Sequence, residues 1–146
     1  MSRAAAERGS NGLSRRRSTD TACAATADRA GRERLPADLH AQRLATPVGP
    51  TDLHVTGDGR VETIEAKRSS EHAFVRQALG QLLDHAVHSP EPAIDPTALL
   101  PDRPKDRDLH LLHTYGIDCT FLDGETFRTE KASDEPRARS RAIWGG

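Results

Sequence analysis

The sequence predicts an α/β domain in which a small mixed sheet is flanked by helices. Three observations predict this class: two alternating runs around an Asp-Gly pair at 51–68, an amphipathic pattern at 71–88, and a short apolar run at 97–100. The Asp-Gly pair favours an antiparallel hairpin, whereas a strand, a helix and a strand in succession favour a parallel crossover. Together they indicate a sheet of mixed direction.

Residues 1–46 are expected to form a disordered basic tail, with a short helix near 33–44. As far as about Gly31 the segment is rich in Ala, Arg, Ser, Thr and Gly and has one leucine, so little apolar surface offsets the entropy of ordering. The tail holds nine Arg and five Asp or Glu, net +4, which leaves −5 for residues 47–146. The Arg15–Arg17 triplet could contact phosphate, but a solvated tail is the simpler interpretation.

The stretch 51–68, TDLHVTGDGRVETIEAKR, is predicted to be a β-hairpin. With Asp58 and Gly59 as loop residues, antiparallel pairing sets Leu53 opposite Ile64, and one step further it sets Asp52 opposite Glu65. Side chains alternate between the two faces of a strand. One face is therefore expected to pack, with Leu53, Val55, Ile64 and Ala66, and the other to carry polar groups, with Asp52, His54, Thr63, Glu65 and Lys67.

Beyond the hairpin, Ser69 or Ser70 can cap a helix over 71–88, in which apolar residues recur at helical spacing from Val75. The 97–100 run then completes a βαβ unit. Asp106 or Asp108 is expected to cap a second helix that stops at Gly116, and 117–121 alternates as a further strand. The core is assigned to 47–127, followed by a flexible C-terminal tail over 128–146.

The polar face of the hairpin carries the residues best suited to chemistry. Opposed carboxylates in a sheet repel each other, so Asp52 and Glu65 call for a compensating cation, and Mg²⁺ or Mn²⁺ suits oxygen ligands of this kind. Lys67 lies on the same face, where its ammonium could neutralise charge on a phosphate or help to generate hydroxide from metal-bound water. A Glu-x-Lys alone is more often the solvated side of an edge strand. The hairpin register, the apolar opposite face and the following helix together favour the functional interpretation.

This pattern resembles the PD-(D/E)xK, restriction-endonuclease-like nuclease superfamily over roughly residues 50–127. The resemblance rests on Asp52, the short hairpin, Glu65-Ala66-Lys67 and a helix reading RQALGQLLDH. It implies an αβββαβ core, a metal held by Asp52 and Glu65, assistance to hydrolysis from Lys67, and a site-orienting glutamine at Gln81. It also sets His85 where some branches carry a Tyr, and it leaves Glu33 as the candidate for a Glu that many branches supply from the first helix.

Several residues have a second interpretation. Gln81 lies at the edge of the apolar stripe, so an exposed boundary residue is an equally good reading, and His54 is expected at the surface rather than as an extra base. The pairs His85/His88 and His110/His113 have spacings found in zinc sites, but nothing in the sequence brings the two helices together. Phosphate-binding Gly-rich loops and Gly-x-Ser-x-Gly elbows are absent from the sequence.

The expected function is metal-dependent hydrolysis of phosphodiester bonds by a nuclease, with DNA favoured over RNA as the partner. The choice between an endonuclease and an exonuclease is left open. The alternative is a catalytically inactive domain of the same fold that binds nucleic acid or protein. No run of about 18 apolar residues occurs, and Cys23 and Cys119 are more simply read as reduced thiols. A cytoplasmic protein without a membrane partner is therefore expected. A homodimer is left open.

Overall fold

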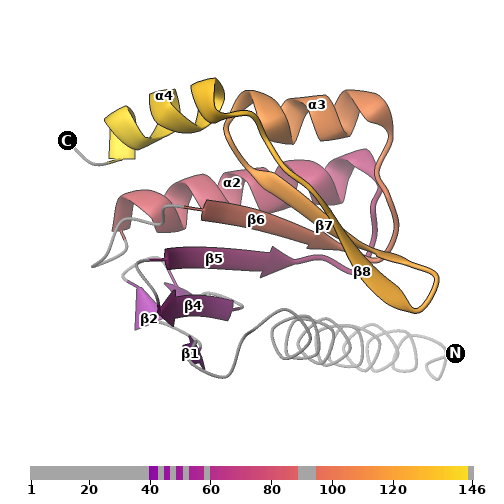
Figure 1. Cartoon of the computed structure of the whole chain (residues 1–146), viewed down its shortest axis with the longest axis horizontal. Helices are drawn as coiled ribbons and strands as arrows, with labels where there is room; N and C mark the ends of the chain where they lie inside the picture. The colour runs from indigo at the N-terminus through magenta and orange to yellow at the C-terminus, as the bar shows by residue number, and fades with distance from the viewer. Residues whose placement is uncertain are drawn as a thin grey trace, which may run out of the picture.

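The computed structural model describes residues 40–42, 45–46, 49–50, 53–57, 60–88 and 95–144. Within them the chain is an α/β domain, in which helices α2 (His72–His88) and α3 (Asp106–Thr114) lie together on one face of a six-stranded sheet (Figure 1). None of the described helices is both long and apolar enough to cross a membrane.

The sheet has mixed direction, as predicted. Its strands are β1 (His40–Gln42), β4 (Leu53–Gly57), β5 (Arg60–Ala66), β6 (Asp95–Leu100), β7 (Asp118–Asp123) and β8 (Thr126–Glu130), adjacent in that order. The first three strands are antiparallel, β5, β6 and β7 are parallel, and β8 returns antiparallel to β7. A separate two-stranded sheet pairs β2 (Ala45–Thr46) with β3 (Gly49–Pro50).

The hairpin register of β4 and β5 is the predicted one. Leu53 pairs with Ile64 at one end and Gly57 with Arg60 at the other. The strands β5 and β6 are joined through α2 as the expected βαβ unit. The Ser69 Oγ accepts the Glu71 backbone N–H at 3.1 Å, one residue before the first residue of α2, and the Glu71 carbonyl accepts the Val75 backbone N–H at 3.1 Å.

Two apolar clusters pack on the two faces of the sheet. The larger unites the inward stripes of α2 and α3 with alternate residues of β6 and β7, and consists of Val75, Ala78, Leu82, Ala98, Leu100, Leu109, Leu112, Ile117, Cys119 and Phe121. The other lies on the opposite face and consists of Leu53, Val55, Ile64, Ala66 and Leu99. The face predicted to pack from the hairpin alternation is confirmed. Burying side chains of this kind contributes about 1.5–3 kcal/mol each.

The short helix expected near 33–44 is wrong where the structure describes it, because His40–Gln42 is strand β1. The free edge of β4 offers backbone partners that outweigh the weak helical tendency of three residues. The rest of that range, including Glu33, lies outside the described residues, as do the expected disordered segment, the Arg15–Arg17 triplet and Cys23.

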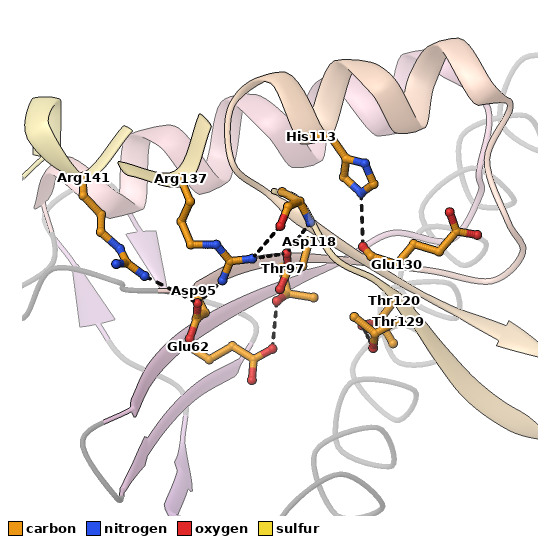
Figure 2. A network of polar contacts seen from close by, with 11 residues as sticks. Glu62, Asp95, Thr97, His113, Asp118, Thr120, Thr129, Glu130, Arg137 and Arg141 are labelled. Carbon is orange, nitrogen blue, oxygen red and sulfur yellow. Dashed lines mark hydrogen bonds and ion pairs between the residues drawn. The ribbon is translucent and has the colours of Figure 1, made fainter. Parts of the chain in front are cut away.

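The segment 128–146, expected to be a flexible tail, completes β8 and forms helix α4 (Asp134–Trp144). Figure 2 shows how α4 is held against the sheet. Arg137 donates to Asp95, the first residue of β6, and to Asp118, the first residue of β7, at 2.6 Å in the second case. The Ser140 hydroxyl donates to the Tyr115 carbonyl at 2.7 Å. Two of the arginines that suggested a solvated tail, Arg137 and Arg141, are thus paired with acids on the sheet, and the folded domain extends beyond 127.

Gly116 ends α3, as the sequence predicts. Its φ is +71°, in the left-handed region that favours glycine, and the Ile117 backbone N–H closes the helix end on the Leu112 carbonyl at 3.0 Å. A side chain is also excluded by space, because a Cβ at this position would lie 2.7 Å from the Arg137 Cα. The same glycine therefore permits the close approach of α4.

Candidate active site

The carboxyl end of β5 and the middle of α2 bring three of the four predicted site residues together. The Lys67 ammonium donates to Glu65 Oε1 at 2.8 Å and also to Gln81 Oε1. Glu65 and Lys67 share a face because they are two residues apart on an extended chain. The backbone N–H of Lys67 donates to the Leu99 carbonyl at 2.9 Å, which continues the β5–β6 ladder to this residue and fixes its position.

Burial decreases across the three residues. Glu65 is 3% exposed, the Lys67 side chain is 12% exposed, and Gln81 is at the surface. A buried carboxylate is costly unless a hydrogen-bonded cation accompanies it, and Lys67 fills that role. A solvent-borne ligand would therefore reach the cluster from the Gln81 side.

The Gln81 amide has a defined orientation in this cluster. An ammonium has three donors and no acceptor, so the oxygen of the amide must face Lys67 and the NH₂ group must turn away from it. Gln81 is exposed on α2, as a boundary residue would be, and its side chain reaches across to the lysine that follows β5.

Asp52 lies one residue before the first described residue of β4, outside the described part of the chain. Its position opposite Glu65, and the metal ion that the pair would hold, stay predictions. Within the described residues no group of three or more His, Cys, Asp or Glu side chains is close enough to hold a metal ion.

The polar face of the hairpin is more buried than the alternation suggested. His54, expected at the surface, is 3% exposed, and its Nδ1 lies 3.2 Å from Thr63 Oγ1. The physical reason is that α2 crosses over this face and packs against β5, so polar residues beside it are enclosed. His85, one helical turn beyond Gln81, is also buried.

Within the part of the chain that the structure describes, the two predicted histidine pairs belong to no group of three or more side chains that could hold a metal ion. His88 Nδ1 donates to the Asp84 carbonyl at 2.9 Å, His113 Nε2 donates to the Glu130 carbonyl at 3.1 Å, and His110 is exposed. Each of the first two has a separate local partner.

The structure pairs Asp108 with His72, a contact that the sequence did not predict. The predicted cap of α3 by Asp106 or Asp108 is wrong, because the N-cap position is Lys105 and no side chain caps the helix. Asp108 is instead buried, and its Oδ1 lies 2.5 Å from His72 Nδ1 at the start of α2. The two residues are 36 positions apart, and no local pattern links them.

No family model, curated protein or solved structure matches the chain.

Proposed function

We propose that the chain is a metal-dependent nuclease of the PD-(D/E)xK class that hydrolyses phosphodiester bonds, with DNA favoured over RNA. One observation carries the proposal: the Lys67 ammonium contacts both Glu65, two residues earlier, and Gln81 on the following helix. These are the residues for which the resemblance implies a shared site, and they come from two separate elements.

The order of the elements supports the same class. Strands β1, β4 and β5 form an antiparallel set, and α2 then leads to β6, parallel to β5. This succession corresponds to the βββαβ part of the αβββαβ core that the resemblance implies. A strand at 40–42 supplies the third antiparallel member, which the sequence pattern did not predict.

Glu65 would hold the divalent cation together with Asp52, which faces it if the observed register continues by one residue. The chemistry of the donor fits, because a carboxylate has about four lone-pair sites and Lys67 engages only one oxygen. A bound Mg²⁺ or Mn²⁺ supplies a polarised phosphate and a water of lowered pKa.

Lys67 and Gln81 then act on the substrate directly. With two of its three donors committed to Glu65 and Gln81, the ammonium retains one for a phosphate oxygen, where it stabilises developing negative charge. The outward NH₂ of Gln81 can donate to a second oxygen. Glu65 and Gln81 together fix the direction in which the Lys67 donor points.

The test is cleavage of labelled duplex DNA by purified protein in Mg²⁺, in Mn²⁺ and in EDTA. Lys67→Ala and Glu65→Gln should each lower the metal-dependent rate by at least about 100-fold. Lys131→Ala removes an exposed lysine and is the matched control. Lys67→Arg keeps a cation beside the buried Glu65 carboxylate, so it separates lost chemistry from a lost fold. Cleavage that persists in Lys67→Ala and Lys67→Arg would refute the assignment.

A catalytically inactive binding module is the second candidate, and one observation favours it. Lys67 already neutralises Glu65 within a buried pair, an arrangement that is also sufficient for a structural role. Such a module would bind DNA or a protein equally well in EDTA and would cleave nothing in either metal. Loss of DNA binding on Lys67→Ala without any cleavage by the wild type would also identify it.

A further inference from the structure

An arginine lies over an aromatic ring beside the Lys67 cluster. The Arg68 guanidinium carbon is 5.0 Å from the centroid of the Phe74 ring. Arg68 directly follows Lys67 and is exposed, whereas Phe74 lies in the first turn of α2 and is half-buried. The face of an aromatic ring attracts a cation at this distance, so the ring helps to hold the guanidinium in place. Because Arg68 is exposed, a planar ligand can approach it from the side away from Phe74.

Phe74 is not part of the apolar core. Neither of the two apolar clusters among the described residues includes it, although Val75, the next residue, is fully buried in the larger one. Core packing therefore does not account for an aromatic at this position. A lone aromatic at a protein surface is ordinary. The informative observation is its location, under the arginine that follows Lys67.

Phe74 and Gln81 lie on the same side of α2. They are seven residues apart, which is about two helical turns, or roughly 10 Å along the axis. Gln81 contacts Lys67, the group proposed to bind the phosphate. Bases of one strand of a duplex are about 3.4 Å apart, so this distance corresponds to at most about three nucleotides. Arg68 and Phe74 are thus placed to meet a base close to the scissile phosphate.

This surface suits a nucleobase better than a phosphate. Glu71 is exposed and directly precedes α2, so an acid flanks the surface and would oppose a bound anion. A nucleobase is uncharged, and its flat face stacks on aromatic rings and on guanidinium planes whatever its identity. The sequence of α2 contains no acid before Asp84. Gln77, exposed one turn before Gln81, offers a neutral amide to the edge of a base.

We propose that Arg68 and Phe74 form a stacking platform for an unpaired nucleobase, so that single-stranded or locally unwound DNA is the form of substrate that the site takes. The base stacks on the Arg68 guanidinium, which is itself supported by the Phe74 ring. In an intact duplex each base is stacked between its neighbours and presents no face to the platform. This inference rests on the proposed function for the identity of the ligand, and it deepens that function by naming the form of DNA.

The experiment measures binding of three fluorescent probes in EDTA: a single-stranded dA octamer, an abasic octamer and a blunt duplex. Wild-type protein should bind the dA octamer more tightly than the abasic octamer, which has the same phosphates but no bases to stack. Arg68→Lys keeps the charge without the planar group, and Phe74→Leu keeps an apolar side chain without the ring. Each substitution should raise the Kd for the dA octamer at least about fivefold and leave the Kd for the abasic octamer unchanged.

Two further variants are the matched controls. Arg76→Lys changes another exposed arginine, on the same helix. Tyr115→Leu changes another aromatic, which is 43% exposed after the end of α3. Both controls should bind every probe as the wild type does. The slope of log K against log salt should be the same in Arg68→Lys and Phe74→Leu as in the wild type, because neither substitution removes a positive charge from the DNA contact.

Three results would overturn the platform. The first is an equal Kd for the dA octamer in wild type, Arg68→Lys and Phe74→Leu. The second is a loss of affinity of the same size for the abasic octamer, which would indicate a contact with the sugar-phosphate backbone. The third is a loss of the same size for the duplex, which would show that the contact does not need an unpaired base.

The outcomes also separate this inference from the proposed function. Cleavage of either DNA form in Mg²⁺ that Lys67→Ala abolishes, with normal binding by Arg68→Lys and Phe74→Leu, supports the nuclease and overturns the platform. Base-dependent binding that both substitutions weaken, in a protein that cleaves nothing in Mg²⁺ or Mn²⁺, supports the platform and overturns the nuclease.

Discussion

Replacing Arg137 with Ala should destabilise the domain by about 3 kcal/mol, because it removes the cation that two sheet carboxylates share. The Arg137 side chain is 11% exposed and contacts Asp95 and Asp118, and it also donates to the Ala132 carbonyl at 3.3 Å. Removing one partner of a buried pair typically costs about 3–5 kcal/mol. We take the lower end, because Asp95 is partly open to water and Asp118 keeps the Ala132 backbone N–H at 2.8 Å.

A loss of about 3 kcal/mol corresponds to a fall in Tm of roughly 6–12 °C for a chain of this size. Thermal unfolding followed by circular dichroism measures it. Arg139→Ala is the matched control, since Arg139 is exposed and only 3.9 Å from Glu135, and it should shift Tm by little. Adding Asp118→Asn to Arg137→Ala should restore part of the loss, because it removes the carboxylate left without its arginine.

The pH dependence gives a sharper check. Burial raises the pKa of Asp118, against the lowering effects of the Ala132 backbone N–H and of Arg137. A carboxyl with a raised folded-state pKa contributes stability that is present in acid and is lost as pH rises through that pKa. Without Arg137 the pKa of Asp118 should rise further. The variant should therefore approach wild-type stability as pH falls, and an equal Tm for Arg137→Ala and Arg139→Ala at pH 7 would refute this account.

Three further predictions concern single residues. Burial raises the pKa of the Cys119 thiol to about 12, so this thiol should be unreactive in the native state. In a Cys23→Ser variant, Cys119 should react with a disulfide reagent at pH 8 only after denaturant is added. Rapid reaction of the native protein would contradict the burial of Cys119. Gly116→Ala should lower the free energy of unfolding by at least about 1–2 kcal/mol, because an alanine there has a left-handed φ and its Cβ clashes with the backbone of Arg137. Denaturant titration measures this change. An unchanged free energy of unfolding would show that α4 can move away. A hydrogen bond from Arg103 lowers the pKa of Glu130, so the pair stabilises the fold at neutral pH, and this contribution is lost as pH falls through the folded-state pKa. Glu130→Gln should therefore lower stability at pH 7 and weaken the fall of Tm in acid. An unchanged fall of Tm in acid would contradict this prediction.

The hairpin and the crossover could be predicted because local features determine them. An Asp-Gly loop fixes which residues of β4 and β5 are opposite, and alternation then fixes the faces. The periodicity of α2 fixes its inward stripe, and therefore the side of the helix on which Gln81 lies. The periodicity did not predict the contact between Lys67 and Gln81. Gln81 was assigned to the site by the resemblance to the nuclease superfamily.

The rest depended on partners distant in sequence. Strand β1 is three residues long, too short for an alternating pattern, and it exists because β4 has an edge to pair with. Helix α4 has the composition of a solvated tail, but the carboxylates that bind Arg137 are 42 and 19 residues away. The pairing of His72 with Asp108 is non-local in the same way.

The Arg137 anchor also limits how this chain can be shortened. Asp95 and Asp118 begin two neighbouring parallel strands, at the opposite end of the sheet from Lys67. A fragment cut after residue 127, which the sequence alone would recommend as the minimal domain, would keep both acids and discard the arginine between them. Such a fragment would contain negative charge in its interior without the arginine that compensates it. A lack of activity in the fragment would therefore say nothing about the role of Lys67 at the opposite end of the sheet.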